Sequence, residues 1–226
     1  MVYIRVYLEK TIVFNGYENM KSKDWLNRQK KDFYVKKAIK KGYLSRAAYK
    51  LIEIDNKFKI LEKSSKVLEF GAAPGGWSQV ALEFVGASNK GKVVSIDIQD
   101  IEPIEGVIFI NGSIMDEEII DTIRQNLKTK ADIVISDMAP YASGHKSTDQ
   151  TRSLLLAELA LDAAISLLKD KGVFCCKLIR GKGEEELVKM MRSYFTEIKR
   201  FKPAASRKDS AEIFLIGLNF NNQDLA

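Results

Sequence analysis

The sequence contains few of the residues that build metal sites or disulfide frameworks. It has two cysteines and one histidine among 226 residues. Cys175 and Cys176 are adjacent inside an apolar run, and neighbouring cysteines rarely bridge, so we expect two free thiols in a reducing compartment. With His145 as the single histidine and no CxxC motif, no zinc or other metal site is expected.

Long hydrophobic runs are also missing. Charged residues interrupt each apolar run well before the roughly 18 residues that a membrane-spanning helix needs. The first residues, MVYIRVYLEKTIVF, lack the basic start, apolar middle and cleavage site of a secretory signal. At 46% hydrophobic and 29% charged residues, the composition is typical of a globular domain. We therefore expect a cytoplasmic protein.

Positive charge is concentrated in one segment. Residues 21–50 carry a net charge of +9, whereas residues 51–226 carry −3 and the whole chain carries +6. The aromatic residues that lie between the lysines of this segment are Trp25, Phe33, Tyr34, Tyr43 and Tyr49. Lysines neutralise phosphates while aromatic rings stack on bases, so the basic segment 21–50 is a candidate RNA-binding surface. The alternative is a solvated helix face whose aromatic rings point into the core.

The order of predicted elements indicates the fold class. A helical pattern extends from about residue 23 to residue 60 and is followed by alternating strand-like and helix-like segments. The strand candidates are Lys66–Phe70, Val93–Ile98, Val107–Ile110, Asp132–Ser136, Val173–Leu178 and Ile213–Leu218. The helix candidates between them are Trp77–Val85, Glu117–Leu127, Ser153–Leu168 and Glu184–Phe195. This alternation predicts a doubly wound α/β fold with a mostly parallel sheet.

A glycine-rich turn follows the first predicted strand, where ligands bind in such folds. Gly71, Gly75 and Gly76 allow a ligand to approach the backbone closely. Asp97 follows the second predicted strand and is a suitable carboxylate for two ribose hydroxyls. The G-x-G-x-x-G fingerprint of nicotinamide dinucleotide enzymes is absent, which disfavours an oxidoreductase. The turn suits a nucleoside with a short amino-acid tail, as in S-adenosylmethionine; a turn without a ligand is the alternative.

Three sequence motifs together resemble a known family. They are SRAAYKL at Ser45–Leu51, LEFGAAPGGWSQ at Leu68–Gln79 and SDMAP at Ser136–Pro140. In this order and spacing they resemble the FtsJ/RrmJ family of ribose 2′-O-methyltransferases. The resemblance implies a Rossmann-like fold dependent on S-adenosylmethionine, with a seven-stranded, mostly parallel sheet.

The resemblance also implies a domain organisation. We expect a methyltransferase domain over residues 23–220 that begins with a basic helical arm over residues 23–60. Residues 1–22 are then a weakly ordered N-terminal extension, and residues 221–226 are a tail.

A catalytic tetrad of two lysines and two acidic residues is implied by the same resemblance. Its members are Lys50, Asp137, Lys177 and Glu212. Our hypothesis is that Lys177 is the general base and that the neighbouring Lys50 ammonium favours its neutral amine. Asp137 and Glu212 then orient the lysines and the ribose.

The cofactor-binding positions carry over from the family less evenly. Gly75, Trp77, Asp97 and Asp137 match them, and Asp137 is expected near the methionine part of the cofactor. Ser113 stands where the family usually has an aspartate beside the adenine, and a serine oxygen can still accept a hydrogen bond there. Trp77 is equally consistent with simple helix packing.

The family resemblance also implies a target. It points to a uridine in the A-loop of 23S rRNA within the large ribosomal subunit. Separately, we expect the protein to be a monomer. A tRNA anticodon-loop methyltransferase and a non-catalytic RNA-binding ribosome-assembly factor are the alternatives.

Overall fold

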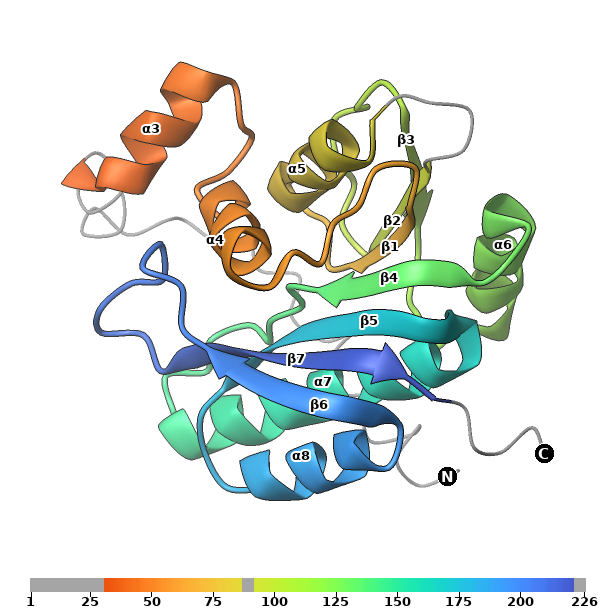
Figure 1. Cartoon of the computed structure of the whole chain (residues 1–226). Helices are drawn as coiled ribbons and strands as arrows, with labels where there is room; N and C mark the ends of the chain where they lie inside the picture. Colours follow the sequence, from red (N-terminus) through yellow and green to blue (C-terminus); the bar gives the residue numbers. More distant parts are fainter. Residues whose placement is uncertain (1–30, 87–91, 222–226) are drawn as a thin grey trace.

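A seven-stranded sheet forms the centre of the computed structural model, which describes residues 31–86 and 92–221 (Figure 1). The strands are β1 (Lys66–Phe70), β2 (Lys92–Asp97), β3 (Val107–Asn111), β4 (Ala131–Ser136), β5 (Leu168–Ile179), β6 (Phe195–Phe201) and β7 (Glu212–Phe220). Their order in the sheet is β3-β2-β1-β4-β5-β7-β6. The first five strands pair in parallel, and β7 is antiparallel to both β5 and β6. The predicted doubly wound, mostly parallel α/β fold is therefore confirmed.

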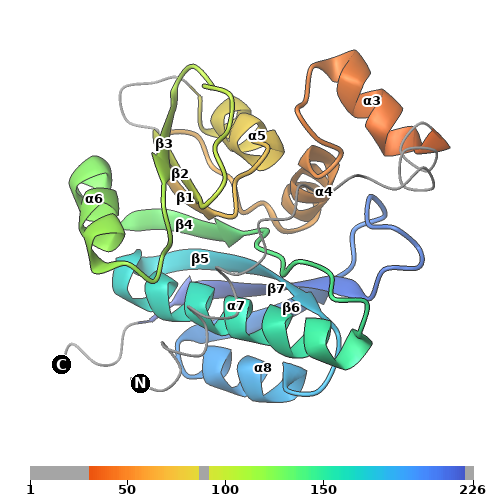
Figure 2. The ribbon, with the colours of Figure 1, turned by 180° about the vertical axis from the view of Figure 1, so that it is seen from behind.

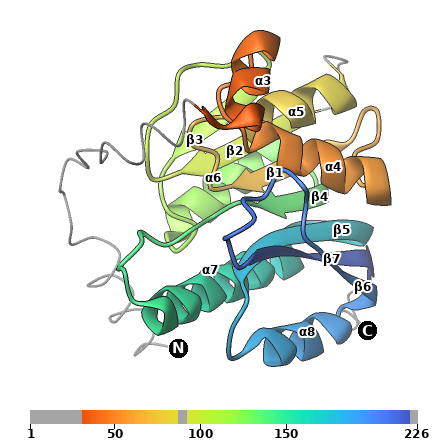
Figure 3. The ribbon, with the colours of Figure 1, turned by 90° about the vertical axis from the view of Figure 1, so that its left-hand side faces the viewer.

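Helices cover both faces of this sheet (Figures 2 and 3). They are α3 (Phe33–Lys41), α4 (Ala48–Phe58), α5 (Gly76–Val85), α6 (Glu117–Leu127), α7 (Lys146–Leu167) and α8 (Glu184–Arg192). The pleat of the strands divides the core in two. Val67 belongs to the cluster with α4 and α5, whereas the next residue, Leu68, packs with α6, α7 and α8. The buried Cys175 and Cys176 also face opposite clusters, and both are free thiols, as expected.

Several element boundaries differ from the predicted ones, and one strand was not predicted. Helix α7 begins at Lys146, not Ser153, because its first two turns are polar and partly exposed and carry no apolar period. Strand β5 begins at Leu168, where Val173 was predicted. Strand β6 was not predicted, since it is an edge strand whose sequence, FTEIKRF, is rich in charge.

In its described part, the predicted basic helical arm over residues 23–60 consists of two separate helices. Gly42 ends α3 in a left-handed conformation with φ +78°, and Lys41 and Ala48 bound the two helices. Leu44 lies between the two helices and is exposed. The predicted extension (residues 1–22), the start of the arm (23–30) and most of the tail (222–226) lie outside the described residues.

Helix α3 stands beyond the carboxyl ends of the central parallel strands (Figures 1 and 2). Asp32 caps its N-terminus, because the Oδ1 atom accepts hydrogen bonds from the backbone of Tyr34 and Val35 at 2.9 and 3.3 Å. Ala38 is its one buried residue and packs near Tyr49. In the described ranges, no helix is long and apolar enough to cross a membrane.

Candidate active site

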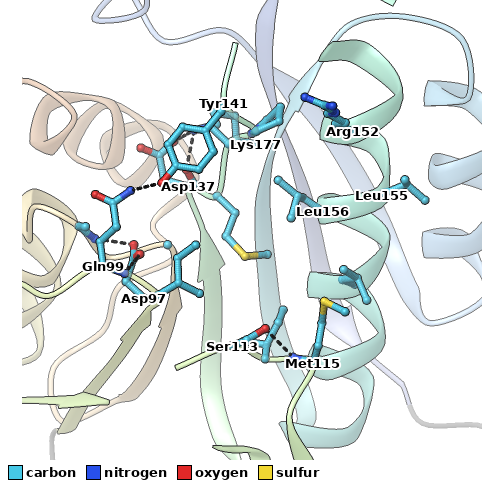
Figure 4. Close-up of a pocket in the computed structure, with 18 of the residues that line it drawn as sticks. Asp97, Gln99, Ser113, Met115, Asp137, Tyr141, Arg152, Leu155, Leu156 and Lys177 are labelled. Carbon is cyan, nitrogen blue, oxygen red and sulfur yellow. Dashed lines mark hydrogen bonds and ion pairs between the residues drawn. The ribbon is translucent and has the colours of Figure 1, made fainter. Parts of the chain in front are cut away.

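A cavity of about 880 Å³ opens at the carboxyl ends of the parallel strands. It is lined by the glycine turn after β1, the ends of β2, β3 and β4, and the first half of α7. Its volume is within the range of small-molecule and cofactor sites. Figure 4 shows Asp97 of β2 and Asp137, which follows β4, on one side of the cavity and Arg152, Leu155 and Leu156 of α7 on the other.

The glycine turn after β1 forms the floor of this cavity. Gly71 has φ +77°, and a Cβ atom there would lie only 2.7 Å from the backbone nitrogen of Met138. Both the conformation and the space therefore require glycine at this position. Gly71 and Ala73 line the cavity, so backbone groups of the turn are exposed to a ligand.

Three of the five predicted cofactor-binding residues, Asp97, Ser113 and Asp137, lie on the cavity wall. Asp97, at the end of β2, accepts hydrogen bonds from the backbone of Ala73 at 2.8 Å and of Gln99 at 2.9 Å. A carboxylate has further lone pairs for the two hydroxyls of a ribose. Ser113 lies after β3, and its hydroxyl oxygen accepts a hydrogen bond from the Met115 backbone at 3.2 Å.

Gly75 and Trp77, the other two predicted cofactor residues, do not line the cavity. Gly75 caps the N-terminus of α5 in a left-handed conformation with φ +109°. Trp77 is only 2% exposed, and its indole Nε1 donates a hydrogen bond to the carbonyl of Ala47 at 2.8 Å. The indole also packs on Phe214 with a centroid distance of 5.5 Å. This geometry favours the packing interpretation of the Trp77 side chain, which connects α5 to α4 and β7.

The four residues of the predicted tetrad come together as two ion pairs. The Lys177 ammonium lies 2.9 Å from Asp137 Oδ1, and Lys50 lies 2.8 Å from Glu212 Oε1. These residues come from the ends of β5 and β4, from α4 and from the start of β7. Lys177 also donates a hydrogen bond to the backbone carbonyl of Asp137. Asp137 and Lys177 line the cavity directly.

Electrostatic coupling extends between the two pairs. Burial raises the pKa of Asp137, but Lys177 and Lys50 outweigh burial, so the net pKa is lowered and the carboxylate stays ionised. Burial lowers the pKa of Lys50, but Asp137 and Glu212 outweigh burial and the net pKa is raised. Lys50 is therefore a fixed positive charge beside the cavity.

A buried acidic residue lies directly behind the glycine turn. Glu69 is fully buried on β1, and its Oε2 accepts hydrogen bonds from Ser78 at 2.5 Å and Ser95 at 2.6 Å. Its other oxygen, Oε1, has no hydrogen-bond partner among the described residues. Burial raises the pKa of Glu69 to about 7. This network joins β1, β2 and α5 beneath the turn.

Sequence reasoning missed the wall that α7 contributes to the cavity. Leu155 and Leu159 of α7 line the cavity one turn apart, as does Arg152. The i, i+4 spacing of the two leucines could have indicated a cavity-lining face, but many helix faces that pack into the core have the same spacing. Tyr141 and Gln99 also lie on the rim, and the Gln99 amide donates a hydrogen bond to the Tyr141 hydroxyl at 3.0 Å (Figure 4).

Most aromatic rings in the described part of the basic segment pack at the junction of α3 and α4, where the Lys37 ammonium lies 4.4 Å from the centre of the Tyr49 ring. Tyr34, Tyr43 and Tyr49 pack on one another between α3 and α4 with centroid distances of 5.5 and 5.7 Å, whereas Phe33 is 68% exposed. The exposed lysines at and within α3 are Lys31, Lys36, Lys37, Lys40 and Lys41. Trp25 lies outside the described residues. Stacking on bases is therefore open to Phe33, while the three tyrosines stabilise the junction of the helices.

Comparisons with known proteins identify the family. The family described as FtsJ-like methyltransferase matches residues 43–220. The ribosomal RNA large subunit methyltransferases E of Rickettsia bellii and Rickettsia akari are 48% and 47% identical over 201 residues, with 88% of each chain covered. A crystal structure described as a ribosomal RNA methyltransferase from Plasmodium falciparum is 32% identical with a TM-score of 0.70. That match covers 79% of this chain and 98% of the other.

The cavity also fits the methyl donor of this family. The carboxylate of Asp97 and the hydroxyl of Ser113 are available for ribose and adenine, and Met138 and Leu159 provide apolar walls. Gly71 leaves the space that a side chain would fill. Together with the match over residues 43–220, this shows that the chain belongs to the FtsJ-like methyltransferase family, whose methyl donor is S-adenosylmethionine.

Proposed function

We propose that this protein methylates a ribose 2′-hydroxyl in the RNA of the large ribosomal subunit. The proposed target is a uridine in the A-loop of 23S rRNA, and the protein acts in the cytoplasm as a monomer. The observation that carries the chemistry is the convergence of Lys50, Asp137, Lys177 and Glu212 as two ion pairs at one end of the cofactor cavity. The target is supported by the ribosomal RNA large subunit methyltransferases E that share almost half of the aligned sequence.

In this proposal Lys177 is the general base. Its side chain is 8% exposed and lies on the cavity wall, where a ribose hydroxyl approaching the methyl donor can reach the nitrogen. S-adenosylmethionine, when bound, would supply the methyl group from its sulfonium. In that complex Lys177 would accept the proton of the hydroxyl as the carbon–oxygen bond forms and the methyl–sulfur bond of the donor breaks, leaving S-adenosylhomocysteine. A positioned base contributes roughly a 10²- to 10⁴-fold acceleration.

The other three residues position Lys177 and the ribose. Asp137 holds Lys177 through its carboxylate and its backbone carbonyl. Glu212 holds Lys50, whose raised pKa keeps it charged, so Lys50 is not a candidate base. Holding two reactants in line supplies much of the acceleration of a displacement reaction.

The exposed lysines of α3 are the proposed RNA contact. They stand on the side of the molecule toward which β4 points, as does the cavity (Figure 1). Lysines in such an array neutralise phosphates regardless of sequence, and the cavity selects the nucleotide.

The test is methyl transfer from labelled S-adenosylmethionine to naked rRNA, large subunits and tRNA, all from cells that lack the modification. We expect label in ribosomal RNA and a loss of roughly 10²- to 10⁴-fold in rate for Lys177→Ala, with normal cofactor binding. Lys177→Arg is expected to be equally inactive, because arginine keeps the charge but does not lose its proton.

Lys169→Ala is the matched control, since Lys169 lies at the opposite end of the same strand. Full activity of Lys177→Ala would exclude Lys177 as the base. Label in tRNA alone would move the target to tRNA, and no label in any RNA despite cofactor binding would favour a non-catalytic RNA-binding role.

A further inference from the structure

An aromatic side chain at the rim of the cavity has no role in the proposed chemistry. Tyr141 lies four residues after Asp137, lines the same cavity and is 53% exposed. Within the described ranges its ring has no aromatic or cationic partner, unlike the packed tyrosines between α3 and α4. A large ring that is half in solvent and half in a binding site is expected to contact a ligand.

The orientation of this ring is fixed before a ligand arrives. The Tyr141 hydroxyl accepts a hydrogen bond from Gln99, so the phenol end is held by the loop after β2 (Figure 4). The backbone just beyond Tyr141 is held as well, because Asp149 Oδ1 accepts hydrogen bonds from the Ser143 amide at 2.9 Å and hydroxyl at 2.7 Å. Two independent contacts therefore reduce the entropy that Tyr141 loses on binding a partner.

The proposed reaction leaves the base of the target nucleotide without its stacking neighbours, so a planar side chain near Lys177 would stabilise it. A ribose whose 2′-oxygen reaches Lys177 must leave the regular stack of its RNA strand, and its base moves with it. That base needs a new stacking partner near the Lys177–Asp137 pair, and Tyr141 is the aromatic side chain on the cavity wall among the described residues. Arg152, on the opposite wall, has no ion pair within 4.0 Å in the described part of the chain. A cation is thus available for the phosphate of the same nucleotide.

We propose that Tyr141 is the platform on which the base of the target nucleotide stacks when its ribose enters the active site. This inference rests on the proposed function and adds a residue that positions the substrate. Because every base presents a flat face, Tyr141 supplies binding of the nucleotide and not the choice among bases.

The experiment measures kcat and KM for large-subunit RNA and for S-adenosylmethionine in three variants, Tyr141→Ala, Tyr141→Phe and Tyr141→Trp. Tyr141→Ala is expected to raise the RNA KM roughly ten- to a hundredfold, the range for loss of one base–aromatic stack. Tyr141→Phe and Tyr141→Trp keep a ring and are expected to stay near wild type. The KM for S-adenosylmethionine is expected to remain unchanged in all three.

A second measurement tests contact between the ring and the base directly. The target nucleotide, mapped in the wild-type reaction, is replaced by an abasic ribonucleotide that keeps its 2′-hydroxyl. If the base stacks on Tyr141, removing the base weakens RNA binding to the wild type but has little further effect on Tyr141→Ala. Met190→Ala, which truncates an exposed side chain on α8, is the control and is expected to behave as wild type.

Three results would overturn the inference. Additive losses for the abasic RNA and Tyr141→Ala would mean that the ring and the base do not touch. If Tyr141→Ala raised the KM for S-adenosylmethionine and not the KM for RNA, Tyr141 would cover the cofactor instead of binding the base. If Tyr141→Phe raised the RNA KM as much as Tyr141→Ala does, the effect would belong to the hydroxyl and not to the ring. A wild-type protein that methylates no RNA would reject the proposed function together with this inference. Failure of the proposed function is therefore distinguishable from the three results above, which require an active wild type.

Discussion

Lys50 and Glu212 are 162 residues apart in sequence, yet the Lys50 ammonium lies within 3.0 Å of both Glu212 carboxylate oxygens. Lys50 belongs to α4 and Glu212 begins β7, so this ion pair connects the helical N-terminal part of the described chain to the sheet. Trp77 supports the same junction, because its indole contacts Ala47 before α4 and Phe214 in β7. The junction therefore holds two of the four proposed active-site residues in place.

Breaking the Lys50–Glu212 pair on one side is expected to destabilise the fold. In Lys50→Ala or Glu212→Ala the remaining charge is mostly buried without its partner, which costs up to about 3 kcal/mol of the free energy of unfolding. The double variant Lys50→Met/Glu212→Leu leaves no unpaired charge and is expected to recover most of that stability. It is not expected to recover methyl transfer. Urea unfolding and the transfer assay measure the two effects separately.

Lys169→Ala is the control for this prediction, because its partner Asp132 and Lys169 itself are more exposed. We expect a change below about 1 kcal/mol there. Single variants of Lys50 and Glu212 as stable as the wild type would show that the pair contributes nothing to the junction.

Asp97 is expected to decide cofactor affinity. Asp97→Ala removes the carboxylate proposed for the ribose hydroxyls and the hydrogen bond that holds the Ala73 amide of the glycine turn. We expect the dissociation constant for S-adenosylmethionine to rise roughly 10- to 100-fold, as for loss of hydrogen bonds to a charged group. Isothermal titration calorimetry with S-adenosylhomocysteine checks this without RNA. Ser113→Ala, which removes a neutral acceptor, should weaken binding less, and the reverse order would contradict the assignment.

Glu69 is expected to make stability depend on pH. Burial raises its pKa from 4.5 to about 7, so between these values the folded state holds a proton that the unfolded state has lost. The free energy of unfolding should therefore fall as the pH rises from about 4.5 to about 7, by roughly 3 kcal/mol in total.

Glu69→Gln tests this, because a neutral amide can still accept hydrogen bonds from Ser78 and Ser95. The variant should lack this decrease and be more stable than the wild type at pH 8. Urea unfolding at a series of pH values is the measurement, and parallel profiles for the two proteins would reject the prediction.

The lysines of α3 are expected to supply RNA affinity without sequence preference. The triple variant Lys36→Glu, Lys40→Glu and Lys41→Glu changes three exposed side chains that form no ion pair among the described residues. We expect weaker RNA binding and a slope of log K against log salt that is less steep by about two units. Filter binding at several salt concentrations measures the slope.

A matched triple variant changes the same number of exposed lysines elsewhere. Lys63 and Lys130 precede β1 and β4, at the amino ends of these strands, whereas the cavity lies at their carboxyl ends. Lys189 lies on α8. Their replacement by glutamate should change the salt slope much less. Equal losses in both triple variants would mean that net charge, and not α3, sets the affinity.

The sequence was sufficient to predict the alternation of strands and helices and the position of the glycine turn, because both depend on residues close together in the chain. The segment KVLEF predicted β1 with its observed limits, Lys66–Phe70, and the helix Glu117–Leu127 was likewise found as predicted. The glycines after β1 indicated the ligand site, since parallel strands end at one edge of a sheet. The four tetrad residues were identified through motifs, but no spacing in the sequence indicated how they pair.

Tertiary structure alone decided those pairings and the walls of the site. The strand order places the ends of β4 and β5 side by side, so Asp137 meets Lys177, while α4 brings Lys50 to Glu212. Trp77, Tyr34, Tyr43 and Tyr49 have sequence contexts that fit a binding role. In the structure Trp77 and Tyr49 are buried, and the partly buried Tyr34 and Tyr43 pack against Tyr49.

Tyr141 shows the converse case. It stands in a polar stretch with no periodicity, and only the fold places it on the rim of the cavity. The physical reason is the range of the interactions involved. Turn conformations and hydrophobic periodicity depend on neighbours within a few residues, whereas burial and ion pairing depend on which distant elements the sheet brings together.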